Sequence, residues 1–342
     1  MSVCMPTLRC VPGWRLMLDS MEAQTFRDFE YIICDGLYDQ RKNEVKKILK
    51  DYSFPIIYVK DKPWYHSEEE QMGKRPGPSS ARNTALIHAK GSLMVWHDDH
   101  TWLPPDWLSR HVKVFEAGFD GMAGMMYGTG DVEVLEKQVP LTKPQPIEGN
   151  DPFNYILHGG CRIPCRWVNG MQGYHDEHKL GELTLLRDHR IDPQSCMQPF
   201  EVPDWDTEGK TLYYIFPPGW LYSCNCSVRT NYLLKINGFP EEFCGQMGSE
   251  DGFLGICLQR AGAKLLLDKK SYVIHVKDKH HLDFYNVLNY KNKEAMLKDG
   301  ILHFSNEKFV EDLQLKEKNR FHSNPHLDLR EMRTQKLKEL YG

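Results

Sequence analysis

The 342-residue sequence has no apolar run long enough to cross a lipid bilayer, which takes about 20 consecutive residues. Its N-terminus, MSVCMPTLRC, lacks the charged and then apolar segments of a signal peptide. The formal net charge of −4 gives no support to a strongly basic nucleic-acid binder. With no export signal, we interpret the ten cysteines as reduced thiols. These absences make a cytoplasmic location, with no membrane span, the expected one.

The sequence also lacks internal repeats and low-complexity tracts, which argues against a solenoid or a disordered chain. Hydrophobic residues make up 41% and charged residues 26%, as in ordinary globular proteins. The length suits one large α/β domain with an insertion, or two small domains.

Short apolar runs alternate with helical patterns in the first part of the chain. Strands are predicted at Ser2–Met5, Phe29–Cys34, Phe54–Val59 and Leu93–Trp96. Helices are predicted over 14–21, 43–50, from a Ser79 or Ser80 N-cap to 89, and from Pro104 to about 115. This alternation indicates βαβ units and a mostly parallel sheet, whose ligand crevice lies at the carboxyl ends of the strands. We therefore expect Thr7, Asp35 and Asp98 to lie near one another.

The rest of the chain divides into three parts. Residues 128–218 are interpreted as an irregular insertion, because they break the alternation with prolines, glycines and histidines. Regular structure is expected again over 219–283, with late strands at 264–267 and 272–276. From 284 to 342 the chain is charged and helical, and one apolar face is predicted to pack on something. The residues of that face are Leu329, Met332, Leu337 and Leu340.

An acidic triplet, Asp98, Asp99 and His100, follows the fourth predicted strand. Adjacent acids repel each other unless a positive charge is present. A divalent cation supplies that charge, and carboxylate and imidazole ligands suit Mn²⁺ or Mg²⁺. The alternative is a solvated acidic turn that begins the next helix.

A second acidic pair, Glu250 and Asp251, stands at the start of a predicted helix. The helix dipole favours acids there by roughly 0.3–1 kcal/mol, which is a sufficient structural explanation for either residue. The glycines before the pair suit a turn that presents the acids to a site. His275 follows a run rich in β-formers and, taken alone, is more typical of a buried core histidine.

The insertion contains Cys161, Cys165, His175 and His178, with the spacing C-x3-C-x9-H-x2-H. These residues are the ligand types of a structural Zn²⁺ site. Their spacing departs from the commonest zinc patterns, so a loop that happens to be rich in cysteine and histidine is the alternative.

Three stretches resemble, in their order and spacing, a GT-A fold glycosyltransferase of family 2. They are SVCMPT with QTFRDFEYIICDGLYD (24–39), SARNTALIHAKGSLMVWHDDHTWLPPDWL (80–108) and NCSVRTNYLLKINGFPEEFCGQMGSEDGFLGICLQRAGAKLLLD (225–268). The resemblance covers about 1–127 and 219–276. It implies an α/β, Rossmann-like fold whose mostly parallel central sheet is flanked by helices. The nucleotide-sugar half would be 1–127, the acceptor-side loops 128–218, the catalytic half 219–283 and a helical extension 284–342.

The resemblance also implies roles for single residues. The metal, Mn²⁺ or Mg²⁺, would be held by Asp98, His100 and His275. The nucleotide, expected to be UDP, would contact Thr7, Asp35, Arg82, Asp98 and Asp99. Asp251 would be the general base of an inverting transfer, with Glu250 as its neighbour.

The second strand departs from the family pattern, because Cys34 stands where an acid is common and Leu37 replaces a serine. This departure supports the alternative of a catalytically inactive binding protein with the same fold. The acceptor stays open among a glycan, a protein, a small molecule and a modified nucleic-acid base.

Overall fold

A computed structural model of the protein describes 1–7, 14–62, 78–99, 101–131, 198–200, 213–215, 221, 223–244, 250–277, 324 and 327–342. The strands are β1 (Ser2–Thr7), β2 (Glu30–Asp35), β3 (Ile56–Lys60), β4 (Leu93–His97), β5 (Thr101–Trp102), β6 (Gly121–Asp131), β7 (Gln198–Phe200), β8 (Tyr213–Ile215), β9 (Asn225–Arg229) and β10 (Leu265–Lys277). The helices are α1 (Trp14–Glu22), α2 (Tyr38–Leu49), α4 (Pro78–His88), α5 (Trp107–Glu116), α9 (Thr230–Ile236), α10 (Glu250–Arg260), α14 (Leu329–Tyr341) and the 3-10 helix η6 (Glu241–Phe243).

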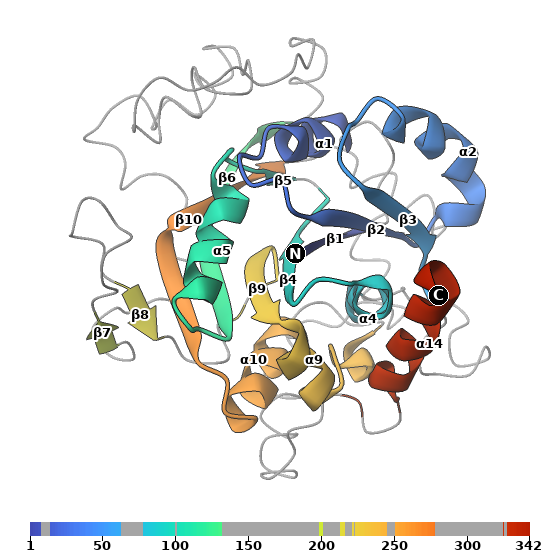
Figure 1. Cartoon of the computed structure of the whole chain (residues 1–342). Helices are drawn as coiled ribbons and strands as arrows, with labels where there is room; N and C mark the ends of the chain where they lie inside the picture. Colours follow the sequence, from blue (N-terminus) through green and yellow to red (C-terminus); the bar gives the residue numbers. More distant parts are fainter. Residues whose placement is uncertain are drawn as a thin grey trace, which may run out of the picture.

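One mixed sheet forms the centre of the molecule, in the order β3-β2-β1-β4-β9-β6-β10-β8-β7, with β5 paired to β10 (Figure 1). The first four strands run parallel to one another, as the βαβ pattern predicts. Strand β9 runs antiparallel to both of its neighbours, β4 and β6. The predicted α/β fold, a central sheet flanked by helices, is confirmed.

Helices cover both faces of the sheet, because successive strand residues point to opposite sides. Val3 and Met5 pack with apolar residues of α1, α2 and α5. Cys4, between them, packs on the other face with residues of α4, α9 and α10. The two apolar cores fix the sheet between helical layers and so place its polar strand ends at one edge.

Helix α4 is buried along almost its whole length, from Ser79 to Ile87. One side of it contacts β1 and β2, and α14 lies against it as well (Figure 1). Leu329, at the start of α14, is fully buried in the core beneath, which confirms the predicted packing of the C-terminal helix. Leu340, at its other end, is 46% exposed, so its predicted place on the packed face is wrong.

Three sequence predictions need correction. Neither Ser79 nor Ser80 caps α4, because the helix already begins at Pro78 and both serines lie in its first turn. The late strands predicted at 264–267 and 272–276 form one strand, β10, with a register irregularity between Asp268 and Tyr272 that accommodates the polar residues. Helix α5 begins at Trp107, a few residues after the predicted Pro104.

Within the described ranges, no helix combines the length and the apolar character needed to cross a membrane. The insertion 128–218 and the extension 284–342 lie largely outside the described residues, so the proposed domain boundaries stay predictions.

Candidate active site

Polar residues from neighbouring parallel strands meet at the carboxyl ends of β1 and β4, which pair side by side. The Thr7 hydroxyl, at the end of β1, donates a hydrogen bond of 2.7 Å to Asp99 Oδ2, just after β4. Both side chains are buried. Thr7 was expected near Asp98, and the structure joins it directly to the next residue, Asp99.

The turn that carries the triplet is supported by a buried histidine, His97. Its Nε2 lies 2.9 Å from the Tyr31 hydroxyl, and its Nδ1 lies 3.0 Å from Thr101 Oγ1 and 2.9 Å from the Asp98 carbonyl oxygen. Burial lowers the pKa of His97 to about 4, so the ring is neutral at physiological pH. Thr101 Oγ1 also donates to the Asp98 carbonyl at 2.7 Å. These contacts hold the backbone carbonyl of Asp98 in place, and the neutral His97 ring adds no positive charge next to the acids.

Arg82, on α4, joins the two acidic motifs. Its Nη1 donates to Glu250 Oε1 at 2.7 Å, and its Nη2 lies 3.8 Å from Asp98 Oδ1. Glu250 opens α10, and Asp98 ends β4, so one guanidinium group connects residues that are far apart in the sequence. The structure thus brings the 98–99 and 250–251 acids to one place.

Neighbouring carboxylates keep the guanidinium group of Arg82 positively charged. Burial lowers the pKa of its guanidinium, but the carboxylates of Glu250, Asp98 and Asp251 act in the opposite direction and outweigh it, so the pKa is raised above its usual value. A permanently charged, planar donor fork is the side chain best suited to phosphate. Arg82 therefore supplies a fixed positive charge between two acids.

Asp251, the predicted general base, is oriented by three donors. Its Oδ2 accepts from the Ser223 backbone N–H at 3.1 Å and from Ser223 Oγ at 3.4 Å. Its Oδ1 accepts from the Gly252 N–H at 2.8 Å. Asp251 is only partly buried, and these donors define the orientation of its carboxylate.

Asp35 lies at the same sheet edge, in register with Thr7, but its carboxylate is engaged internally. It receives two hydrogen bonds from Arg41, at 2.7 and 2.8 Å, and one each from the Leu37 N–H at 2.8 Å and the Tyr58 hydroxyl at 2.5 Å. Four donors match the acceptor capacity of a carboxylate. A nucleoside contact by Asp35 would have to displace one of them, and this role stays a prediction.

Asp61, which directly follows β3, was not singled out from the sequence although the strand-end rule applies to it equally. Burial raises its pKa to about 7, helped by the charges of Asp35 and Glu241 and opposed by Lys62. Its Oδ1 is buried and makes no hydrogen bond among the described residues. A buried oxygen of this kind, at the edge where ligands bind, is a candidate ligand contact.

The structure describes only some of the residues of the predicted metal site. The backbone of His275 pairs with that of Thr101 on β5, which follows the triplet directly. This register places β10 beside the strand that follows the triplet, and the role of His275 as a metal ligand stays a prediction. His100 and the side chain of His275 lie outside the described residues, and the described part holds no complete group of three metal-binding side chains. The carboxylates of Asp98 and Asp99 are the oxygen ligands that Mn²⁺ and Mg²⁺ prefer.

The possible zinc ligands of the insertion fall outside the residues that the structure describes, and this site stays a prediction. They are Cys161, Cys165, His175 and His178.

Comparison with known proteins finds a family model that matches the first part of the chain, which supplies Thr7, Arg82, Asp98 and Asp99. Residues 2–168 match the family model "Glycosyl transferase family 2". Glycosyltransferase GlyA of Streptococcus pneumoniae serotype 4 is 24% identical over 133 residues, which are 39% of this chain and 17% of that protein. The chain therefore corresponds to only a small part of that relative.

Among solved structures, S. aureus TarS residues 1–349 in complex with UDP is 15% identical, with a TM-score of 0.44, over 94% of this chain and 73% of that one. Another TarS structure is 16% identical, also with a TM-score of 0.44, over 92% of this chain and 43% of that one. The family match, in turn, includes Thr7, Arg82 and the acidic triplet.

Proposed function

We infer that this chain, which carries a glycosyltransferase family 2 region over residues 2–168, transfers a sugar from a nucleoside-diphosphate sugar to an acceptor hydroxyl. The observation that carries the proposal is the placement of Arg82 between Asp98 and Glu250, at 3.8 and 2.7 Å. That placement unites the acids expected to bind the donor with the acids expected to act on the acceptor. Acids and a fixed cation in one site suit a reaction in which a negative diphosphate leaves.

The donor end of the site is formed by the strand edge. Thr7 and Asp99, joined by their 2.7 Å hydrogen bond, form a rigid polar pair for the ribose or the phosphates. Asp61 adds a buried oxygen that has no hydrogen bond among the described residues, and we assign the nucleoside as its partner. UDP is the nucleotide that the family resemblance implies, and it is the first one to test.

The residues at the end of β4 fit a divalent cation. Asp98, His100 and His275 would hold Mn²⁺ or Mg²⁺, and the ion would offset the charge that develops on the leaving diphosphate. Arg82 contributes a second, fixed positive charge next to Asp98.

At the acceptor end, Asp251 takes the proton of the attacking hydroxyl. The oxygen attacks the anomeric carbon while the bond from that carbon to the diphosphate breaks, and attack from the opposite face inverts the configuration. The donors from Ser223 and Gly252 keep the carboxylate aimed before the acceptor arrives. A positioned general base contributes on the order of 10²–10⁴ in rate.

The test is a screen of nucleotide-sugars that measures release of the nucleoside diphosphate, with Mn²⁺ and with a chelator. We expect metal-dependent release from one donor. Asp251→Asn should retain UDP binding and lose at least about 100-fold in transfer rate, the range of a general base. Asp28→Asn, which removes an exposed carboxylate, is the matched control. Transfer that survives the Asp251 change would refute the base assignment.

A second candidate function is a binding protein with the same fold and no turnover. The saturation of Asp35 by Arg41, Leu37 and Tyr58, together with Cys34 in place of an acid, favours it. Metal-dependent hydrolysis of a nucleotide-sugar without acceptor would exclude it. Tight UDP binding without turnover of any donor would support it.

A further inference from the structure

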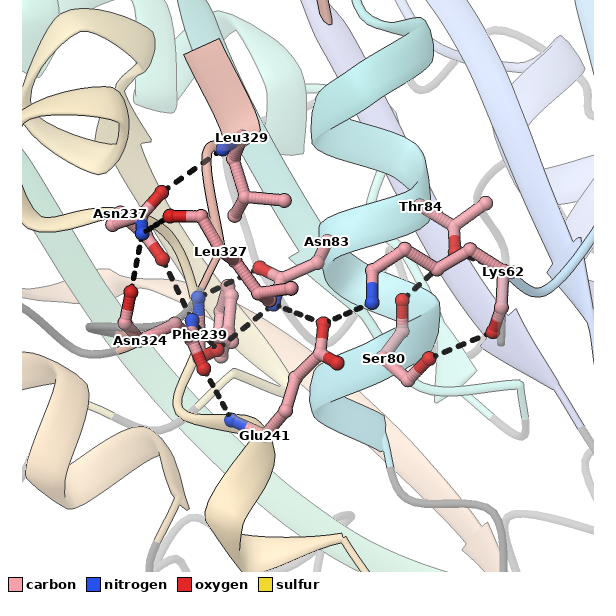
Figure 2. A network of polar contacts seen from close by, with 10 residues as sticks. All are labelled: Lys62, Ser80, Asn83, Thr84, Asn237, Phe239, Glu241, Asn324, Leu327 and Leu329. Carbon is pink, nitrogen blue, oxygen red and sulfur yellow. Dashed lines mark hydrogen bonds and ion pairs between the residues drawn. The ribbon is translucent and has the colours of Figure 1, made fainter. Parts of the chain in front are cut away.

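A loop from Asn237 to Glu241 lies between helix α4 and the residues that precede α14, and a dense polar network holds it there (Figure 2). The loop follows α9 and leads into η6. It lies within the 225–268 stretch that resembles glycosyltransferase family 2, but that resemblance assigns it no role, and the family-model match ends at residue 168.

Asn324 holds this loop from the C-terminal side. Its Nδ2 donates to the carbonyl oxygens of Asn237 and Phe239, at 2.6 and 2.5 Å, and its Oδ1 accepts from the Glu241 N–H at 2.8 Å. The side chain is only 4% exposed. One amide group therefore satisfies three backbone groups of the loop, where each unpaired buried group would be costly.

Asn237 completes the connection in the opposite direction. Its Oδ1 accepts from the Leu329 N–H at 3.0 Å, and its Nδ2 donates to the carbonyl oxygens of Asn324 and Leu327. The residue has a φ of 65°, a left-handed conformation in which asparagine is tolerated. We call Asn324, Asn237 and the backbone groups they bind the C-terminal latch.

The other side of the loop is hydrogen-bonded to α4 through Asn83. Asn83 Oδ1 accepts from the Phe239 N–H at 2.7 Å, and its Nδ2 donates to the Phe239 carbonyl and to Glu241 Oε1, both at 2.8 Å. Glu241 Oε1 also pairs with Lys62 Nζ at 2.5 Å. A Cβ at Gly238 would lie 2.3 Å from Asn83 Oδ1 and from Leu329 Cδ1, so the three segments meet without spare room.

Asn83 is the residue after Arg82, and the loop also contacts Arg82 directly. The Phe239 ring lies 5.2 Å from the Arg82 guanidinium carbon, within the range of a cation–π contact. The loop thus holds the turn of α4 that carries Arg82, through Asn83, and contacts the Arg82 side chain that reaches Asp98 and Glu250.

We propose that Asn324 is a positioning residue for the nucleotide site, acting through the 237–241 loop on Arg82. This rests on the proposed function, because Arg82 must contact the nucleotide for its position to matter. Asn324 then contributes to nucleotide binding, although it lies in the C-terminal extension and far in sequence from the site.

The test is a double-mutant cycle read by calorimetric titration of UDP in the presence of Mn²⁺. Asn324→Ala should weaken UDP binding about tenfold in the wild-type background, and by less than about twofold in the Arg82→Lys background, because the two changes then act on the same contact. Arg333→Ala is the matched control. It removes the 3.0 Å bond from Arg333 Nε to the Ala89 carbonyl, which also ties α14 to the end of α4, and it should leave UDP affinity unchanged.

A measurement on the wild-type chain covers the case in which Asn324→Ala does not fold. Binding effects are reciprocal, so a latch that improves UDP affinity must itself be stabilised by UDP. Saturating UDP with Mn²⁺ should slow hydrogen exchange of the Glu241 and Leu329 amides, by up to about tenfold. The Lys264 amide, bonded to Asp120 Oδ2 in a remote turn, is the control whose exchange should not change.

The outcomes separate the two proposals. If wild-type protein binds UDP and Arg82→Lys weakens that binding, but Asn324→Ala has no effect or the two changes add independently, the positioning role is overturned and the proposed function stands. Unchanged exchange of Glu241 and Leu329 at saturating UDP overturns it as well. If the wild-type protein binds neither UDP nor any other nucleoside diphosphate with Mn²⁺, the proposed function fails and the role of Asn324 fails with it.

Discussion

Replacing Asp61 by asparagine should stabilise the protein, and the gain should grow with pH. The pKa of Asp61 in the folded protein is about 7, against an ordinary value of 3.8. Burial is the main cause, and Asp35 and Glu241 add to it. The folded state therefore holds a proton that the unfolded state releases, and the stability that this proton provides is lost as pH rises from about 4 to about 7.

The size of the effect follows from those two values. A difference between 3.8 and about 7 corresponds to about 4 kcal/mol once the group is ionised in both states. About 1.5 kcal/mol of that cost is already present at pH 5, so wild type should lose about 2.5 kcal/mol between pH 5 and pH 8 through this group alone. Asp61→Asn removes this titration, because an amide carries no charge at either pH.

Urea denaturation of both proteins at pH 5, 6, 7 and 8 measures the prediction. The difference in the free energy of unfolding, variant minus wild type, should increase by about 2.5 kcal/mol across this range. Asp51→Asn, at an exposed carboxylate, is the control for the loss of one charge. A difference that stays flat with pH, or that falls, would refute the assignment of a buried, protonated Asp61.

Three further changes test other contacts. Asp98→Ala should abolish the Mn²⁺-dependent part of UDP binding measured by titration calorimetry, and equal binding with and without metal in the wild type would contradict this. Asp35→Ala should lower the free energy of unfolding by about 3–5 kcal/mol, because it leaves the buried charge of Arg41 without its carboxylate, and a loss below about 1 kcal/mol would show that the pair is not a structural one. Gly238→Ala should cost at least about 1 kcal/mol in urea denaturation, since its φ of 75° is left-handed and the new methyl group meets Asn83, and an unchanged midpoint would argue against that packing.

Local patterns predicted the part of the fold that carries the donor end of the site. The alternation of strands and helices predicted β1 to β4, and the strand-end rule placed Thr7 beside the acidic triplet, where the 2.7 Å bond to Asp99 is found. The same rule should have drawn attention to Asp61, which follows β3 in the same way. It did not, because no neighbouring acid or motif marks that residue.

Contacts between segments that are far apart in the chain could not be predicted from the sequence. Nothing local indicates that Arg82 joins Asp98 to Glu250, since that geometry depends on α4 lying across the strand ends. The C-terminal latch is harder still to predict from the sequence, because Asn324 and Asn237 are 87 residues apart. A single asparagine also belongs to no hydrophobic pattern that would indicate its partner. Asp35 shows the converse, because its position favoured a ligand contact while its carboxylate is occupied by the nearby Leu37 N–H, by Arg41 and by Tyr58.

Anomalous diffraction at the manganese edge, from crystals of the chain with UDP and Mn²⁺, tests the central claim most directly. The account predicts one manganese peak bound by Asp98, with the diphosphate between that ion and Arg82 and with Asp251 facing the vacant sugar position. A manganese peak elsewhere, or UDP bound away from Arg82, would contradict it.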